Sequence, residues 1–238
     1  MDSEGGSEAG WRRRVLVTGA NRGIGLELVR QYAAAGADVI ATCRDPREAA
    51  DLRTIGGAVT VHRLDVTSAS DLDELQAALA GTPVDILVGN AAVFGGTRSR
   101  LADVDWDAWS AALEVNVLGN IRVALRLWPD VAASRERKIV FVSSRAGLPR
   151  EAAPNRSYIY SSSKAALNSA VRCFALDLAP EGVITALVNP GHVQTRIGGA
   201  RAPMTPAESV TKVRAVIESL TAADAGKFLH FDGTELKL

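Results

Sequence analysis

Val15-Leu-Val-Thr-Gly-Ala-Asn-Arg-Gly-Ile-Gly-Leu-Glu27 is the stretch from which the fold of this chain can be read. Its first three residues are a short apolar run of the kind found in buried parallel strands. Apolar residues then recur at helical spacing from Ile24 onward. A strand therefore turns into a helix between Gly19 and Gly25, where glycines allow close backbone approach and the first N–H groups of the helix are unpaired. Such a turn favours a phosphate group, and a dinucleotide pyrophosphate is the natural ligand.

The three glycines of this turn follow Thr18 and are spaced as Gly-x3-Gly-x-Gly (Gly19, Gly23, Gly25). This spacing differs from the G-x-G-x-x-G of the commonest dinucleotide-binding fold. Taken alone, it fits a tight turn that packs a helix onto a sheet as well as it fits a cofactor site, because short glycine motifs recur by chance. The rest of the chain has to decide between the two interpretations.

Length and charge restrict the class of protein. The 238 residues suit one α/β domain, and 27 basic residues balance 27 acidic ones. A formal net charge of zero provides no field for nucleic acid or a membrane surface, so the expected partner is a small molecule. We expect residues 1–11, which are polar and unlike a signal peptide, to form a disordered tail, and residues 12–238 to form a single domain. No apolar stretch has the length of a membrane span, and Cys43 and Cys173 suit reduced thiols of a cytoplasmic protein.

Strand and helix patterns alternate along the chain. After the first strand and helix, further strands are predicted at 37–42, 58–64, 83–89, 139–144, 183–188 and 227–231. Long helices are predicted at 106–131, 158–179 and 206–220. This alternation predicts a doubly wound parallel β-sheet, Rossmann-like, with helices on both faces.

The end of the second predicted strand indicates the type of cofactor. A carboxylate at this place commonly binds the adenosine ribose of NAD, whereas a basic residue accommodates the 2′-phosphate of NADP. Cys43 and Arg44 stand there, and Arg22 in the glycine turn supplies a second guanidinium. We therefore predict NADP(H), with NAD(H) as an alternative cofactor. The competing interpretation is that both arginines are solvated and that Asp45 partly neutralises Arg44. Asp65, at the end of the third strand, favours a contact with the adenine.

Tyr160 and Lys164 are four residues apart on one predicted helix, so their side chains share a face. A free phenol has a pKa of about 10, and a nearby ammonium is expected to lower that pKa. Such a tyrosine exchanges a proton with a carbonyl oxygen, and Ser144, at a strand end, offers a hydroxyl to the same oxygen. An isolated Tyr-x-x-x-Lys is usually an ordinary pair on a helix face.

The motifs occur together, and in this combination the chain resembles the short-chain dehydrogenase/reductase family. The matching residues, in the order of the family, are Thr18-Gly-Ala-Asn-Arg-Gly-Ile-Gly25, Asp65-Val66, Asn90-Ala91, Asn116, Ser144, Tyr160-Ser-Ser-Ser-Lys164 and Asn189-Pro190-Gly191. The resemblance covers about residues 12–233. Within the family, the chain is most similar to carbonyl reductases of the C-factor and sniffer type.

The resemblance implies a role for each matching position. Tyr160 is the expected acid/base, and Lys164 is expected to lower its pKa and to hold the nicotinamide ribose. Ser144 is expected to orient the substrate carbonyl, and Asn116 to support a water-linked proton path to Lys164. Without the resemblance, Asn116 is interpreted as a satisfied polar group inside a helix. Cofactor contacts are expected from Gly19, Asn21, Arg22, Gly23, Ile24, Gly25, Arg44, Asp65, Val66, Asn90, Ala91, Tyr160, Lys164, Pro190, Val193 and Thr195. No metal site is expected.

Three features depart from the family pattern. The usual Asn-Asn-Ala-Gly after the fourth strand is Gly89-Asn-Ala-Ala92 here, which removes one side-chain contact near the cofactor. The long gap before Tyr160 leaves Ser143 as a rival to Ser144 for the catalytic serine. His192 stands where relatives often carry an aromatic residue, and we expect it to pack at the solvent edge.

The leading hypothesis is an NADPH-dependent reductase of aldehydes or ketones. The alternatives are an NAD(P)-dependent alcohol dehydrogenase working in the oxidative direction and a dinucleotide-binding regulatory protein with little turnover. Residues expected to border the substrate by loop position are Phe94, Arg145, Tyr158, His192 and Met204. The family resemblance implies a homodimer or homotetramer that pairs through the two long helices 106–131 and 158–179.

Overall fold

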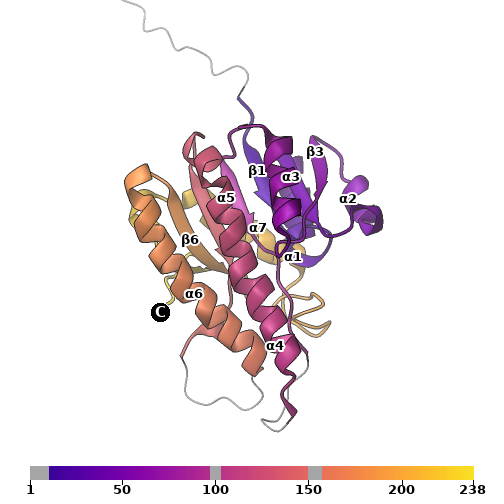
Figure 1. Ribbon diagram of the computed structural model, residues 1–238, viewed down its shortest axis with the longest axis vertical. Coiled ribbons are helices and arrows are strands. Elements are labelled where there is room, and N and C mark those ends of the chain that lie inside the picture. Colours follow the sequence, from indigo (N-terminus) through magenta and orange to yellow (C-terminus); the bar gives the residue numbers. More distant parts are fainter. Residues whose placement is uncertain (1–10, 97–102, 150–156) are drawn as a thin grey trace, which may run out of the picture.

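The computed structural model describes residues 11–96, 103–149 and 157–238. All seven strands of this part belong to one parallel sheet, in the order β3-β2-β1-β4-β5-β6-β7 (Figure 1). The strands are β1 (Arg14–Val17), β2 (Asp38–Cys43), β3 (Val59–Arg63), β4 (Ile86–Gly89), β5 (Lys138–Val142), β6 (Ile184–Asn189) and β7 (Phe228–His230). The predicted doubly wound parallel fold is confirmed.

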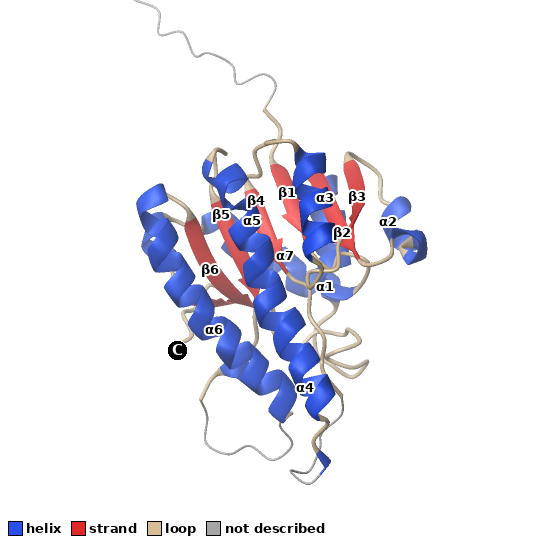
Figure 2. Ribbon diagram, in the orientation of Figure 1, coloured by secondary structure: helices blue, strands red, loops and turns tan. Residues whose placement is uncertain are grey.

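Helices cover both faces of the sheet (Figure 2). The helices are α1 (Gly23–Ala34), α2 (Ala50–Arg53), α3 (Ala69–Leu79), α4 (Trp106–Leu113), α5 (Asn120–Ala132), α6 (Tyr158–Leu178) and α7 (Pro206–Ser219). Helices α3, α5 and α6 lie on one face, and α1 and α7 lie on the other. The part of the chain that the structure describes contains no helix long and apolar enough to cross a membrane.

Alternation along the strands divides the core into two. Val15 and Val17 face the α1 and α7 side, whereas Leu16 between them packs with the helices of the opposite face. Successive side chains of a strand point to opposite faces, so a strand covered on both sides is apolar throughout. This explains why the β1 sequence is an unbroken apolar run.

The long helix predicted over 106–131 is interrupted. A π-helical turn, Glu114–Gly119, separates α4 from α5 and contains the buried Asn116. Such turns are rare and occur frequently at functional sites. The spacing of apolar residues over 106–131 does not distinguish a π-helical turn from a continuous α-helix.

The strand order sets the place of the ligand cleft. The chain runs outward from β1 to β2 and β3, then returns to place β4 on the other side of β1. Ligands of open α/β sheets bind outside the carboxyl ends of the strands at this point of reversal. We therefore expect the residues that follow β1 and β4 to form the ligand site.

Candidate active site

The turn after β1 is built around glycines that no other residue can replace. Gly19 and Gly23 have positive φ values of 63° and 57°. A Cβ on Gly19 would lie 2.9 Å from the Ala91 Cα, and one on Gly25 would lie 2.5 Å from the Asn90 amide nitrogen. The glycines thus allow the turns after β1 and β4 to touch.

Hydrogen bonds fasten these two turns together. The Thr18 hydroxyl accepts from the backbone N–H groups of Asn90 at 2.9 Å and Ala91 at 3.0 Å. The Asn90 side chain donates to the carbonyls of Thr18 at 2.8 Å and Gly19 at 3.1 Å. Helix α1 then starts without a side-chain cap. Its free N–H groups and the glycine cradle fit a dinucleotide pyrophosphate.

A cavity of about 940 Å³ runs along this turn. Its lining includes eleven of the residues predicted to bind cofactor, namely Gly19, Asn21, Arg22, Gly23, Ile24, Arg44, Asp65, Val66, Asn90, Ala91 and Thr195. Gly25 is absent from this lining because it packs against Asn90. The sequence interpretation missed Arg30, which also lines the cavity and pairs with Glu27 at 3.6 Å.

The basic end of this cavity is not neutralised by Asp45. That carboxylate accepts from the Arg47 guanidinium at 2.8 and 3.0 Å and from the Arg47 backbone N–H at 2.9 Å. Burial opposes ionisation of Asp65, but hydrogen bonds from Thr67 outweigh it, and with Arg44 nearby the pKa of Asp65 is lowered. Arg44 and Arg22 are both exposed and border the cavity.

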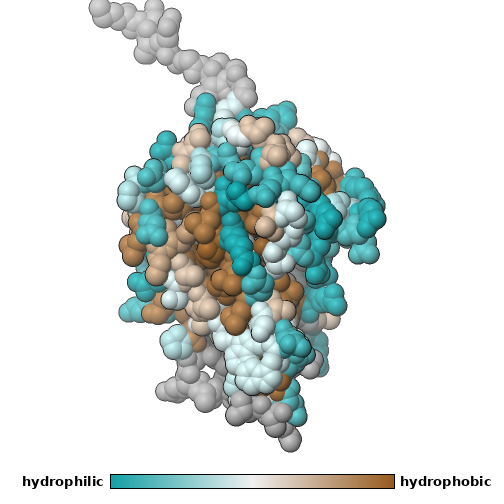
Figure 3. Space-filling model, viewed as in Figure 1, coloured by the Kyte–Doolittle hydropathy of each residue, from teal (hydrophilic) through white to brown (hydrophobic). Residues whose placement is uncertain are grey.

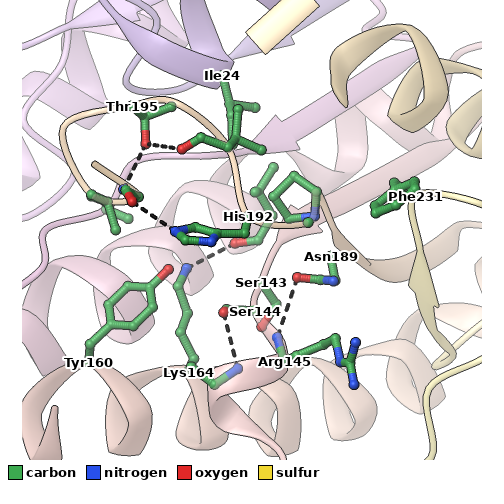
Figure 4. A pocket seen from close by; sticks show the side chains of 18 of the residues that line it. Ile24, Ser143, Ser144, Arg145, Tyr160, Lys164, Asn189, His192, Thr195 and Phe231 are labelled. Carbon is green, nitrogen blue, oxygen red and sulfur yellow. Dashed lines mark hydrogen bonds between the residues drawn. The ribbon is translucent and has the colours of Figure 1, made fainter. Parts of the chain in front are cut away.

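A second cavity of about 640 Å³ contains three of the four predicted catalytic side chains, Asn116 being the exception (Figure 4). Ser144, Tyr160 and Lys164 line it, together with Pro190 and Val193. Ile24, Asn90 and Thr195 line both cavities, so the two lie side by side. The residues placed together from the sequence by family resemblance therefore meet in one cleft.

The Tyr160 ring packs beside the Phe94 ring, with the two ring centroids 5.3 Å apart. Burial raises the pKa of Tyr160 to about 12, and a hydrogen bond with Ser144 offsets only part of this rise. The expected lowering of the Tyr160 pKa by Lys164 is therefore wrong for this arrangement. Desolvation by burial is the largest influence on this pKa, so the phenol is protonated at neutral pH.

Lys164 is fully buried behind Tyr160. Its Nζ donates to the Val142 carbonyl at 2.9 Å and lies 5.8 Å from the centroid of the Tyr160 ring. Burial lowers the pKa of Lys164 to about 8. An ammonium has three donors, so two remain for groups other than Val142.

The two neighbouring serines have different surroundings. The buried Ser143 hydroxyl donates to the Asn168 amide oxygen on α6. The Ser144 hydroxyl accepts from the Ala146 N–H at 3.1 Å and interacts with the Tyr160 hydroxyl. Ser144 is thus the serine whose hydroxyl is available to a ligand beside Tyr160.

Asn116 lies in the π-helical turn and is completely buried. Its amide oxygen accepts from Val93 N–H at 2.8 Å, and its amide nitrogen donates to the Val93 carbonyl at 2.9 Å and to the Ser163 hydroxyl at 3.0 Å. Asn116 therefore joins the segment after β4 to α6 next to Lys164. The described residues show no direct hydrogen bond between Asn116 and Lys164, so the proton path stays a prediction.

The segment after β6 forms the remaining wall. The Pro190 carbonyl accepts from the Ser209 hydroxyl at 2.7 Å, and Val193 pairs with Met204. The Thr195 hydroxyl donates to the Val193 carbonyl at 3.3 Å, and its methyl group is close to Gly23. This wall therefore closes over the start of α1.

Four of the five residues expected to border the substrate line the catalytic cavity, namely Phe94, Arg145, His192 and Met204. Tyr158 does not line it, because this exposed side chain packs toward Trp109, with ring centroids 6.3 Å apart. His192 is at the solvent edge as expected, where its Nε2 bonds the Gly198 carbonyl at 2.8 Å. His230 and Phe231, at the end of β7, also line the cavity and were missed.

Comparison with known proteins decides the family. A family model described as short chain dehydrogenase matches residues 13–205. The chain belongs to the short-chain dehydrogenase/reductase family. Members of this family are oxidoreductases that bind NAD(P).

Individual relatives of this short-chain dehydrogenase/reductase agree with the predicted resemblance. C-signal of Myxococcus xanthus is 38% identical over 154 residues, which cover 65% of this chain and 92% of the relative. An NADPH-bound carbonyl reductase from chicken fatty liver superposes with a TM-score of 0.87 at 27% identity, covering 95% of this chain and 99% of that chain. The carbonyl reductase Sniffer of Drosophila melanogaster has a TM-score of 0.87 at 25% identity, covering 96% and 100%.

The departure of this short-chain dehydrogenase/reductase at Gly89 has a structural reason. A Cβ on Gly89 would lie 2.8 Å from the Phe141 ring and 3.1 Å from the Asn120 amide oxygen. Asn120, on α5, donates from its amide nitrogen to the carbonyls of Ala91 at 2.9 Å and Val115 at 3.0 Å. Asn120 therefore fills the space beside Gly89 and ties the cofactor turn to the π-helical turn.

Asn120 was missed as a site residue. Its only sequence signal is a second asparagine one helical turn after Asn116 in an otherwise apolar stretch. A buried amide needs hydrogen-bond partners, and those partners are backbone carbonyls that the sequence does not reveal.

Proposed function

We propose that this protein reduces the carbonyl group of an aldehyde or ketone to an alcohol with NADPH. The observation that carries the proposal is the convergence of Ser144, Tyr160 and Lys164 in a cavity that lies beside the glycine-lined cleft. A bound nicotinamide supplies hydride to the carbonyl carbon. Everything else in the reaction falls to side chains of this chain.

Ser144 and Tyr160 act on the carbonyl oxygen. Their hydroxyls face each other, so one oxygen atom placed between them accepts hydrogen bonds from both. As charge develops on that oxygen, the Tyr160 hydroxyl donates its proton. Lys164, which is mostly protonated at neutral pH, stabilises the phenolate that is left and supports its reprotonation.

The protonated Tyr160 hydroxyl suits the role of acid in reduction, while the ratio of reduced to oxidised cofactor sets the direction of the reversible hydride transfer. Oxidation of an alcohol requires a phenolate to accept the proton, whereas a phenol with a pKa of about 12 is protonated at neutral pH. Tyr160 is therefore ready to act as an acid.

Arg22 and Arg44 support the preference for NADPH. Both border the cleft beyond the glycine turn, and Asp45 is occupied by Arg47 rather than by Arg44. Two guanidiniums near the adenosine ribose attract a 2′-phosphate, which NADH lacks. NAD(H) is the weaker alternative.

Self-association is part of the proposal. Leu125 on α5 is 54% exposed and Leu176 on α6 is 75% exposed. Figure 3 shows hydrophobic surface over these two helices. We propose that this face pairs with a second copy of the chain, because exposed apolar patches mark interaction surfaces.

The decisive experiment is the Tyr160→Phe variant, which keeps the ring and removes only the hydroxyl. NADPH oxidation in the presence of aldehydes, quinones and keto esters should fall by about a thousandfold, the range of a general acid. NADPH affinity, measured by fluorescence titration, should change little. Retained turnover in the variant would remove Tyr160 from its role. Tight NADPH binding by the wild type without turnover of any substrate would instead favour a regulatory protein.

A further inference from the structure

The side chains that line the catalytic cavity include basic ones but, among the described residues, no acidic one. Among the described residues, the ionisable side chains that line it are Arg145, Tyr160, Lys164, His192 and His230, and neither an aspartate nor a glutamate joins them. The rest of the lining is largely apolar, with Phe94, Met204 and Phe231 contributing the large side chains. A cavity of this kind favours a ligand that is partly apolar and partly anionic.

Arg145 occupies a defined place in this cavity. It directly follows Ser144 and begins a short turn, Arg145–Gly147, which the Ser144 hydroxyl caps. Figure 4 shows its side chain on the other side of Ser144 from Tyr160. Within the described residues, its guanidinium has no hydrogen bond or ion pair, whereas Arg13, Arg47 and Arg122 each pair with a carboxylate. The Arg145 charge is therefore available to a ligand.

A buried asparagine links the His230 ring to the backbone of Arg145. The Asn189 amide oxygen accepts from the Arg145 backbone N–H at 3.4 Å, and its amide nitrogen lies 2.7 Å from His230 Nδ1. An amide nitrogen only donates, so Nδ1 accepts and the proton of a neutral His230 is on Nε2. His230 is thus a hydrogen-bond donor on the same wall as Arg145.

Building on the proposed carbonyl reduction, we propose that Arg145 binds a carboxylate of the substrate, with His230 as a second donor. The preferred substrate is then a keto acid or aldehyde acid, in which an apolar spacer separates the carboxylate from the reacting carbonyl. A guanidinium matches a carboxylate with two parallel hydrogen bonds, and no acidic side chain of the described lining competes for it. Phe94, Met204 and Phe231 provide apolar surface for the spacer.

The test compares two ketones with the same carbon skeleton around the reacting carbonyl, the anionic 5-oxo-5-phenylpentanoate and its uncharged methyl ester. For the wild type, kcat/KM for the acid should exceed that for the ester by about tenfold or more, the range of a hydrogen-bonded ion pair. Arg145→Gln should bring this ratio close to one, and Arg145→Lys should keep part of it. The matched control is Arg201→Gln, because Arg201 is exposed and lines neither cavity of this cleft. It should leave the ratio unchanged.

The carboxylate site would be refuted if the wild type had similar kcat/KM values for the acid and the ester, or if Arg145→Gln kept the wild-type ratio of the two values. Either result would leave the proposed carbonyl reduction unaffected. If the wild type reduces neither ketone, the carboxylate site is tested by measuring ligand binding instead of turnover. Isothermal titration with the unreactive 5-phenylpentanoate in the presence of NADPH should then show binding to the wild type and to Arg201→Gln, with about tenfold weaker binding to Arg145→Gln. Equal binding to all three proteins, or no binding to the wild type, would refute the inference. In this way the failure of the carboxylate site and the failure of the proposed activity give different results.

Discussion

Lys164 Nζ lies 5.8 Å from the centroid of the Tyr160 ring, one helical turn away, yet its hydrogen bond goes to the carbonyl of Val142 at the end of β5. The strand therefore holds the ammonium at a fixed depth below the phenol. Lys164 is buried and Tyr160 is half-buried, and their pKa values move in opposite senses, to about 12 for Tyr160 and about 8 for Lys164. At neutral pH the Tyr160 hydroxyl therefore keeps its proton. Lys164 is charged, but its pKa lies only about one unit above neutral pH.

The rate of carbonyl reduction should depend on the protonation of Lys164. Below pH 8 the lysine is charged and stabilises the Tyr160 phenolate, whereas above pH 8 it becomes neutral and this help is lost. The rate should therefore be high near neutrality and fall as pH rises through about 8. Steady-state kinetics between pH 6 and 10, with buffers of constant ionic strength, checks this. A profile that is flat across pH 8 would contradict the assigned role of Lys164.

Replacing Arg44 should change the preference between the two cofactors. Arg44→Ser removes a guanidinium from the cleft, so we expect the ratio of kcat/KM for NADPH to that for NADH to fall by about tenfold. The control is Arg201→Ser, because Arg201 is exposed and lines neither cavity of the cleft. A proportional loss with both cofactors in Arg44→Ser would show that Arg44 does not contact the 2′-phosphate.

Asn120→Ala should weaken cofactor binding without removing any residue of the cleft lining. The variant frees the Ala91 and Val115 carbonyls, so the turn that lies against Gly19 loses its tether. We expect the Kd for NADPH to rise about tenfold, from the loss of hydrogen bonds worth about 1 kcal/mol each. Asn120→Asp serves as a second variant, since a carboxylate cannot donate and should not rescue binding. Unchanged NADPH affinity in a folded Asn120→Ala protein would confine Asn120 to a structural role.

Charged substitutions on the exposed helix face should separate the copies of the chain. Leu125→Glu and Leu176→Glu place carboxylates in the proposed interface, where burial of unpaired charge is costly. Light scattering after size-exclusion chromatography should show a dimer or tetramer for the wild type and a smaller species for the variants. Leu238→Glu, at an exposed position near the C-terminus, is the control. A wild-type monomer would disprove the assembly.

The alternation of strands and helices and the place of the cofactor turn could be predicted because local patterns determine them. The apolar run of β1, the glycines of the following turn and the Thr205 cap with Pro206 at the start of α7 act over a few residues. Their spacing is visible in the sequence, and the structure agrees closely. The predicted ends of the strands differ by one to three residues, because hydrogen bonding to neighbouring strands determines where each one stops.

Features that depend on distant residues could not be predicted. The π-helical turn at Asn116 exists where the segment after β4 and helix α6 meet, and the Asn189–His230 bond joins residues from two strand ends. The pKa of Tyr160 was predicted in the wrong direction because the sequence shows the neighbouring lysine but not the loss of water around the phenol. Residues 1–10, 97–102 and 150–156 lie outside the described residues, so the tail prediction is untested apart from Trp11, which packs under Arg135.

Strand β7 leaves the ribosome after the six other strands of the described sheet. Every strand that borders the dinucleotide cleft precedes residue 196 in the chain, whereas β7 comes more than thirty residues later and pairs only with β6. A nascent chain that folds from its N-terminus can therefore assemble the cofactor end first. His230 and Phe231 lie on this later segment, whereas Phe94 and Arg145 lie between earlier strands, so the lining of the catalytic cavity is assembled from segments that are synthesised at different times.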